Sequence, residues 1–307
     1  MKIYDEVFES GYLGLNERGN IRDEYNLIKS EKFPDFREQF GESVTHFENI
    51  IISDIHLGSR LSQTDMLISF LKNISFNRLI INGDVFDSIN MKRLNRHHWK
   101  VLSVLRKITD KDMGKEVIWI RGNHDGFSDL LTQLLGIKVY NEFAFEWNNK
   151  KVIALHGDVF DVYTSKHPIL SEIADIIYKI SISIDPVKNR LSKFLKKNTK
   201  AFLRNVQIVR ERSIAYGKHK NAQVVCCGHT HYPEIIEEEK MTYINSGSWT
   251  THPTTFIGFT KDKVKVVPFT HNDVQNIEAS KNEVKNLLHQ IEYYDTSEVS
   301  HAIQIEY

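Results

Sequence analysis

The stretch Asn49-Ile50-Ile51-Ile52-Ser53-Asp54-Ile55-His56 decides the fold of this chain. Its first half is a short run of β-branched residues, which is typical of a strand that is buried on both faces of a sheet. Its second half places a carboxylate and an imidazole directly after that strand. In open α/β sheets the ligand site lies beyond the carboxyl ends of the strands, so Asp54 and His56 are candidate site residues.

Four further polar clusters follow apolar runs in the same way. The strands expected at 78–81, 116–120, 151–155 and 222–227 end at Asn82-Gly83-Asp84, Gly122-Asn123-His124-Asp125, His156-Gly157-Asp158 and Gly228-His229-Thr230-His231. Helical patterns at 62–74 and 90–109 separate the first three strands, which indicates β-α-β units. The clusters at three such strand ends are therefore expected to converge in space.

The residue types of the five clusters indicate a site for two metal ions. Carboxylates, imidazoles and one amide oxygen are ligands of borderline and hard divalent cations, and the clusters contain no thiolate. Two cations about 3.5–4 Å apart can hold the attacking and leaving oxygens of an in-line displacement at phosphorus. The chemistry that the clusters predict is therefore hydrolytic.

Composition excludes several other classes of protein. Lysine plus arginine equals aspartate plus glutamate at 40 each, so the overall charge does not indicate nucleic-acid binding. The sequence has neither a run of apolar residues as long as a membrane span nor the apolar core of a signal peptide at its start. The two cysteines, Cys226 and Cys227, are adjacent in an apolar run and are expected to be buried rather than paired. We therefore expect the protein in the cytoplasm.

The five clusters together resemble the ligand pattern of the calcineurin-like metallophosphoesterase superfamily. The resemblance implies that one metal ion is bound by Asp54, His56, Asp84 and His231, and the other by Asp84, Asn123, His156 and His229. It also implies that His124 stabilises the transition state or acts as general acid, with Asp125 orienting its imidazole. Asp87, Asp158 and Asp161 stand beside ligands and are expected to form hydrogen bonds to them rather than to bind metal. Tentative substrate contacts are Arg121 and His252.

Details of the motifs narrow the resemblance further. The protein Ser/Thr phosphatase branch is disfavoured, because Ser88 and Asp125 stand where that branch has arginine and glutamate. The motifs are similar to those of UDP-2,3-diacylglucosamine pyrophosphohydrolases, although the best-known form has arginine in place of His124. The expected substrate is that glycolipid or a related nucleotide-linked one. The alternatives are a nuclease or soluble nucleotide phosphodiesterase, and a non-catalytic metal-bound scaffold.

Residues 165–215 are predicted to form a helical cap inserted in the core. Two apolar stripes at helical spacing lie within 169–180 and 187–206, and eleven basic against four acidic residues give the segment a net charge of +7. Such a cap would suit an acylated diphosphate at an anionic membrane surface, which would make the protein peripheral on the inner membrane. A hairpin that packs its stripes on the core fits the pattern equally well. Nucleic acid is disfavoured because aromatic residues are sparse there.

These expectations amount to a four-layer α-β-β-α sandwich of two mixed sheets with outer helices. The core comprises 46–164 and 216–270, between an N-terminal extension at 1–45 and a C-terminal tail at 271–307. The cofactors are two divalent metal ions, with manganese expected first and iron or zinc as alternatives. The oligomeric state does not follow from the sequence.

Overall fold

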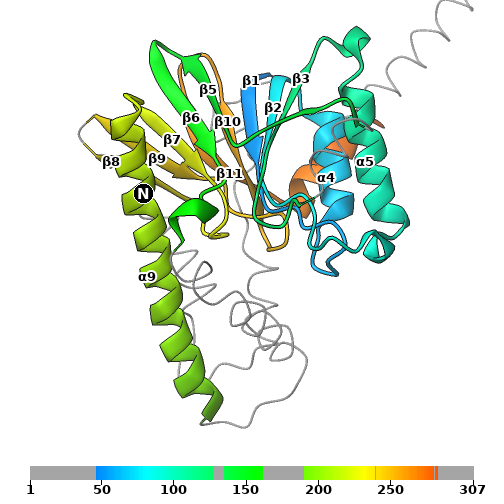
Figure 1. The fold of residues 1–307 in the computed structure, drawn as a ribbon. Helices are drawn as coiled ribbons and strands as arrows, with labels where there is room; N and C mark the ends of the chain where they lie inside the picture. Colours follow the sequence, from blue (N-terminus) through cyan, green and yellow to red (C-terminus); the bar gives the residue numbers. More distant parts are fainter. Residues whose placement is uncertain (1–45, 127–134, 162–189, 239, 280, 283–307) are drawn as a thin grey trace, which may run out of the picture.

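The computed structural model describes residues 46–126, 135–161, 190–238, 240–279 and 281–282 of the chain, without the side chains of residues 111 and 190–201 (Figure 1). The predicted N-terminal extension at 1–45 and the first apolar stripe of the predicted cap lie outside the described residues. The core that surrounds the polar clusters lies almost entirely within them.

Eleven described strands form two sheets, and each sheet contains both parallel and antiparallel pairs. The first has the order β11-β10-β1-β2-β3-β4, with bounds Val264–Phe269, Thr254–Phe259, Phe47–Ile52, Phe76–Asn82, Glu116–Ile120 and Lys138–Tyr140. The second has the order β5-β6-β7-β9-β8, with bounds Glu142–Trp147, Lys150–Leu155, Val224–Cys227, Met241–Asn245 and Glu234–Glu238. The expectation of two mixed sheets is confirmed.

Alternation along the strands explains why the two sheets stack. In β1, Ile50 and Ile52 pack under the helices on the outer face of the first sheet, while Ile51 packs against the second sheet. Side chains of a strand point alternately to its two faces, so a continuous run of isoleucine suits a strand that is covered on both. The neighbouring β2 repeats this arrangement, with Leu79 and Ile81 on one face and Ile80 on the other.

Helices cover both outer faces and complete the four layers. The helices α4 (Thr64–Asn73) and α5 (Arg96–Ile108) cover the first sheet, and α9 (Arg190–His219) covers the second (Figure 1). Three short 3-10 turns, η1, η2 and η3, span Met91–Arg93, Lys111–Met113 and Asp158–Phe160. The predicted helix at 90–109 is therefore divided, because Asn95 caps a new helix with its side chain accepting from the backbone N–H groups of His97 and His98.

The predicted boundary between cap and core at residue 215 falls inside α9. The last part of this helix packs on β7 and β9, with Val206, Val209 and Ile214 buried and Ser213 fully enclosed. The first part of α9 continues beyond the edge of the sheets (Figure 1). One uninterrupted helix thus belongs to the outer layer at its C-terminal end and projects from the core at the other.

The predicted tail also contributes to the core at its start. Residues 271–279 are helical, and Ile277 is buried in the same cluster as α4 and α5. The side chain of Lys281 donates a hydrogen bond to Asn73 at the end of α4. Among the helices of the described part of the chain, none combines the length and apolar character that crossing a membrane requires.

Candidate metal centre

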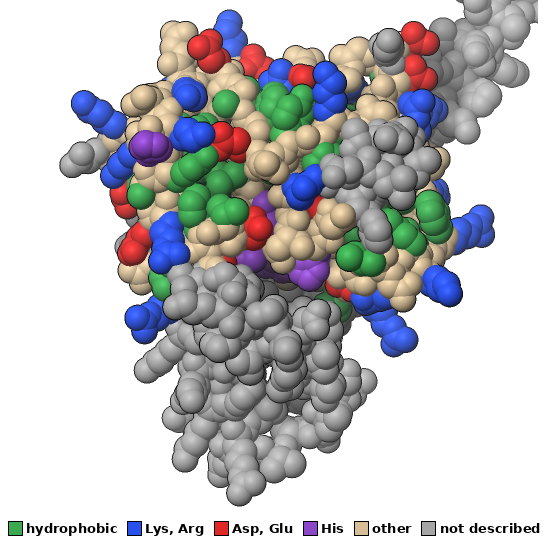
Figure 2. Space-filling model, viewed as in Figure 1, with side chains coloured by type: hydrophobic (Ala, Val, Ile, Leu, Met, Phe, Trp, Pro, Cys, Tyr) green, Lys and Arg blue, Asp and Glu red, His purple; other side chains and the backbone are tan. Residues whose placement is uncertain are grey.

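The polar clusters meet at one end of the sandwich, where the carboxyl ends of strands from both sheets come together. The segments that follow β1, β2 and β3 come from the first sheet, and those that follow β6 and β7 come from the second. Histidine side chains, purple in Figure 2, gather there with acidic ones at the edge of the core. Two groups of three side chains, each with its ligand atoms within 4.8 Å of one another, could bind a metal ion. Group one is Asp54, His56 and His231, and group two is Asp84, His156 and His229.

The backbone is strained where it presents these side chains. Of the eight described residues other than glycine with a left-handed backbone, five belong to the two groups: Asp54, His56, Asp84, His229 and His231, with φ between 48° and 65°. This conformation costs free energy for residues that carry a Cβ atom, and such strain clusters at functional sites. The sharp turns after β1, β2 and β7 therefore aim side chains from different strands at one point.

Close approach to Asp84 requires a glycine at position 122. A Cβ atom on Gly122 would collide with the backbone nitrogen and the carboxylate of Asp84. The backbone of the turn after β3 must pass directly over that carboxylate, and the N–H of His124 donates to Asp84 Oδ1 at 2.9 Å. A larger residue at position 122 would displace the carboxylate from group two.

The geometry of group two fits a divalent cation. His156 donates from Nδ1 to the carbonyl oxygen of Asn82 at 2.8 Å, which leaves the lone pair of Nε2 directed into the site. That Nε2 atom is buried, has no hydrogen-bond partner among the described residues, and lies 3.4 Å from Asp84 Oδ2. Two electron-pair donors that face each other without a hydrogen bond need a positive charge between them.

The raised pKa of His156 also indicates that group two favours a positive charge. Burial lowers this pKa, but the Asp84 carboxylate and then the Asp54 carboxylate outweigh burial and raise it to about 10. Group two therefore attracts positive charge strongly. A divalent cation can supply that charge with the imidazole in its neutral, ligating form.

His229 completes group two through its other ring nitrogen. Its Nε2 lies 2.9 Å from Oδ2 of the buried Asp161 carboxylate, so the hydrogen bond assigns the proton to Nε2. The lone pair of Nδ1 is then the one that His229 offers to a metal ion. A carboxylate behind a ligating histidine fixes its tautomer and ring orientation.

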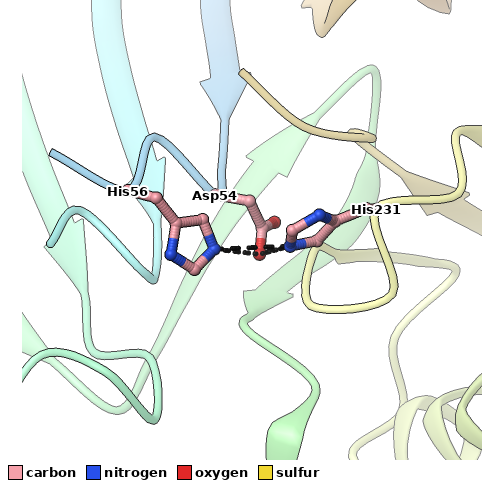
Figure 3. Close-up of side chains that lie close together, drawn as sticks. All are labelled: Asp54, His56 and His231. Atoms are coloured by element: carbon pink, nitrogen blue, oxygen red, sulfur yellow. Dashed lines mark hydrogen bonds and ion pairs between the residues drawn. The ribbon is translucent and has the colours of Figure 1, made fainter. Parts of the chain in front are cut away.

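Group one gathers around one oxygen of Asp54. His231 Nε2 lies 3.0 Å and His56 Nε2 lies 3.9 Å from Asp54 Oδ1, and the two nitrogens are 3.4 Å apart. Figure 3 shows both imidazoles pointing toward the carboxylate from opposite sides. Burial and then the neighbouring His231 lower the pKa of His56, which lies at about 4 although Asp84 and Asp54 oppose this. A neutral His56 can offer its lone pair to a cation at neutral pH.

Asp84 stands between the two groups. Its Oδ2 atom lies 3.4 Å from His156 Nε2 and 3.8 Å from His56 Nε2. His124 Nε2 lies 3.9 Å from the same oxygen. The carboxylate predicted to serve both metal ions is therefore the one that faces histidines of both groups.

The expectation that Asp125 orients the imidazole of His124 is wrong. Both oxygens of the buried Asp125 carboxylate accept other hydrogen bonds, from the backbone N–H groups of Val85, Phe86 and Gly122 and from the indole of Trp119. His124 Nδ1 instead lies 3.2 Å from the carbonyl oxygen of Asp87, to which it donates. Asp125 thus fixes the loops after β2 and β3, and Asp87 leaves Nε2 of His124 facing the site.

The other predicted residues lie around the two groups. Asp87 Oδ1 is 3.8 Å from His56 Nδ1, and its other oxygen pairs with Arg93 at 2.5 Å. A cleft of about 330 Å³ beside group two is lined by Arg121, Gly122, Asn123, Asp125, Gly126, Asn141, Asp158 and Val159. His252 is exposed and its ring packs against His271, so its role in substrate binding stays a prediction.

Comparison with known proteins shows which family has this arrangement of residues. The profile of the calcineurin-like phosphoesterase superfamily domain matches residues 48–262, which is more than half of the chain. The chain belongs to the calcineurin-like phosphoesterase superfamily. As a member of that superfamily it is a metal-dependent phosphoesterase, and the family and the two side-chain groups imply divalent metal ions.

Several solved structures match the chain at low sequence identity. A phosphoesterase from E. coli, YfcE, is 17% identical with a TM-score of 0.38, and the match covers 72% of this chain and 99% of that one. An archaeal phosphodiesterase is 16% identical with a TM-score of 0.39, covering 72% and 98%. Vps29 of Entamoeba histolytica, solved with zinc, is 13% identical with a TM-score of 0.33, covering 72% and 99%. The comparison with curated proteins found no match.

Three site residues of this calcineurin-like phosphoesterase escaped the sequence analysis as functional residues. Asn82 belongs to the polar cluster after β2. Only the fold shows that its backbone carbonyl accepts a hydrogen bond from His156, while its side-chain amide donates to the carbonyl of Leu155 in the second sheet. Arg93 and Asn205 lie far in sequence from the aspartates that they contact. Each contact joins residues that are not neighbours in sequence, so no local signal distinguishes Arg93 or Asn205.

Proposed function

We propose that this phosphoesterase hydrolyses a phosphodiester or pyrophosphate bond with two divalent metal ions, manganese in the first place and iron or zinc as alternatives. Group one and group two would each bind one ion, with Asp84 shared and Asn123 as a further oxygen ligand. The observation that carries the proposal is the position of Asp84 Oδ2, which lies within 3.8 Å of a histidine nitrogen from each group. When bound, such ions neutralise the phosphoryl oxygens and lower the pKa of water for attack on phosphorus.

The chain's own residues then orient the substrate and supply a proton. His124 is partly exposed, and its donation from Nδ1 to Asp87 holds Nε2 on the side of Asp84. A protonated Nε2 at this place could donate to a phosphoryl or leaving-group oxygen, which is the work of a general acid. Arg121 and Asp158 line the adjacent cleft and would contact the group attached to the phosphate.

The substrate class that we propose is a nucleotide-linked glycolipid such as UDP-2,3-diacylglucosamine. Apolar side chains are exposed beside the centre: Phe202 and Leu203 on α9, and Val159 in η3. The ring of Phe202 lies 6.4 Å from that of Tyr232, which directly follows the group-one residue His231. An apolar surface thus begins one residue from a candidate ligand, where an acyl chain of the sugar linked to the phosphate would lie. Such a substrate would place the enzyme at the cytoplasmic surface of the inner membrane.

A soluble nucleotide or other phosphodiester is the second candidate. The cleft beside Asn123 is also lined by Arg121, Asn141 and Asp158, whose polar side chains can form hydrogen bonds to a sugar or a base. A scaffold that binds metal without turnover is the third outcome, and absence of hydrolysis from a metal-loaded protein would establish it.

A substrate panel on the full chain with Mn²⁺ separates these candidates. It comprises UDP-diacylglucosamine, soluble nucleotides, single-stranded DNA and an aryl phosphodiester. We expect the Phe202→Ala, Leu203→Ala double variant to lose about tenfold or more in turnover of the glycolipid and little on the aryl diester, because two apolar contacts to the bound acyl chain would be removed. The control is Trp99→Ala, which removes an exposed aromatic ring from α5.

Equal loss of both activities in the double variant would contradict the glycolipid proposal. Turnover of nucleotides or DNA by the wild type, without turnover of the glycolipid, would favour the second candidate instead.

A further inference from the structure

The group-two ligand His229 is supported from behind by a buried carboxylate. Asp161 directly follows η3, its side chain is almost fully enclosed, and its Oδ2 atom accepts from His229 Nε2 at 2.9 Å. A charge-assisted hydrogen bond of this kind fixes both the tautomer and the orientation of the ring. The direction of the His229 lone pair therefore depends on where Asp161 is held.

Asp161 is in turn held by helix α9. The side-chain amide of Asn205 donates to the same Oδ2 atom at 3.0 Å. Asn205 is half-buried on the helix face toward η3, one turn after the exposed Phe202. Three side chains thus form a hydrogen-bonded series from the cap helix to the candidate metal ligand: Asn205, Asp161 and His229.

Further contacts fix α9 against η3, so the position of Asn205 is well determined. Arg212 donates from Nη1 to the carbonyl oxygen of Phe160 at 3.1 Å. A methyl group of Val209 lies where a Cβ atom on Gly157 would reach van der Waals contact, directly before η3. Both contacts are made by residues that closely precede Asp161 in the sequence, Phe160 and Gly157. The helix and the turn therefore move together.

We propose that Asn205 is a positioning residue for the metal ion of group two, acting through Asp161 on His229. The inference rests on the proposed two-metal function and deepens it, since it assigns to α9 a part in the geometry of the metal centre. Asn205 contacts neither metal nor substrate. Its loss would remove one of the hydrogen bonds that hold the Asp161 carboxylate, so the orientation of the His229 ring would be fixed less firmly.

Cobalt binding tests the proposal without reliance on turnover. Co²⁺ alone is titrated into the chelator-treated full chain, and both calorimetry and the visible absorption of the bound Co²⁺ are recorded. The variants are Asn205→Ala, which removes the donor and suits a helix, and Asn205→Asp, which keeps the shape but opposes Asp161 with a second carboxylate. Asn205→Gln retains an amide donor. The control is Gln207→Ala, because Gln207 is exposed on the same helix and bonds to Glu211.

We expect Asn205→Ala to weaken one of two cobalt sites about fivefold, the effect of one lost hydrogen bond, and Asn205→Asp to weaken it more. The absorption of that ion should change, Asn205→Gln should restore binding in large part, and Gln207→Ala should match the wild type. Identical isotherms and spectra in wild type, Asn205→Ala and Asn205→Asp would overturn the proposal, as would an equal effect of Gln207→Ala. Failure of the proposed function has a different signature, since a wild type that binds two ions but hydrolyses no phosphoester contradicts the function alone.

Discussion

The two ligand groups of the metal centre differ in how deeply the fold encloses them. The side chains of group two, Asp84, His156 and His229, are 3%, 0% and 8% exposed. In group one Asp54 is fully enclosed, but His231 is 32% exposed. Group two is therefore buried between the two sheets, whereas group one is open to solvent on the side of His231.

The hydrogen bonds behind the histidines follow the same division. His156 and His229 each donate to a buried acceptor, the carbonyl of Asn82 and the carboxylate of Asp161. His56 Nδ1 faces Asp87 at 3.8 Å, beyond hydrogen-bond range. Ligands that are already oriented lose less conformational entropy when a metal ion binds. We expect group two to bind its ion more tightly, and the following experiments test this comparison.

Asp84→Asn should have the largest effect, because the residue faces both groups. The variant removes a negative charge that both proposed metal ions would need, and such ions contribute several kcal/mol to transition-state stabilisation. We expect hydrolysis of an aryl phosphodiester to fall at least about 1000-fold. Asp112→Asn, at an exposed aspartate in η2, is the control. Turnover by Asp84→Asn at the wild-type rate would refute the proposed metal mechanism.

Removal of one histidine from each group should show which group binds which of the two ions. Calorimetric titration of the wild type with Mn²⁺ should show a tighter and a weaker step. We expect His156→Ala to lose the tighter step and His231→Ala the weaker one, each with a drop of more than about 100-fold in affinity for the ion concerned. The exposed His219 provides the control variant His219→Ala. Loss of the same step in both variants would show that the groups do not bind separate ions.

Substitution of the supporting carboxylates should have a smaller and unequal effect. Asp161→Asn weakens a short hydrogen bond to His229, so we expect about a 10- to 100-fold loss of metal affinity at one step. Asp87→Asn alters a longer contact to His56 and should cost less than about tenfold. Metal content after dialysis against a weak chelator measures both. The comparison between the groups is wrong if Asp87→Asn proves the more damaging change.

The pH dependence of stability in the metal-free protein should show opposite signs for the two groups. The folded-state pKa of His156 is raised from 6.5 to about 10, so its contribution is complete below pH 6.5 and is lost as the pH rises toward 10. The pKa of His56 is lowered to about 4, so its contribution is complete above pH 6.5 and is lost as the pH falls toward 4.

Thermal unfolding of the chelator-treated protein across pH 4–10 measures these slopes. His156→Gln should flatten the alkaline limb of the melting temperature, and His56→Gln the acid limb. Added Mn²⁺ should reduce the alkaline dependence, because a cation replaces the proton between His156 and Asp84. Identical alkaline limbs in His156→Gln and the wild type would contradict the assignment.

Much of the fold follows from local pattern. The runs around Ile50–Ile52 and Glu116–Ile120 predict strands because β-branched and aromatic residues fill both faces, and the structure places β1 and β3 there. The turn between β5 and β6 consists of Asn148 and Asn149, a residue type that tolerates a left-handed backbone, and both have positive φ. The structure also contains the short strands β4 and β8. The short strand β8 has five residues, of which three are glutamates, and this composition is unusual for a strand.

The sequence by itself determined the reaction class and the ligand residues to consider, because carboxylates and imidazoles after buried strands have few other uses. Only the tertiary structure decided which of them face one another and what stands behind each. Asp125 follows His124 in sequence yet binds the loops, while Asn205 lies 44 residues from Asp161 and donates to it. Hydrogen bonds between elements depend on how helices and sheets pack, and the spacing of residues along the chain does not contain that information.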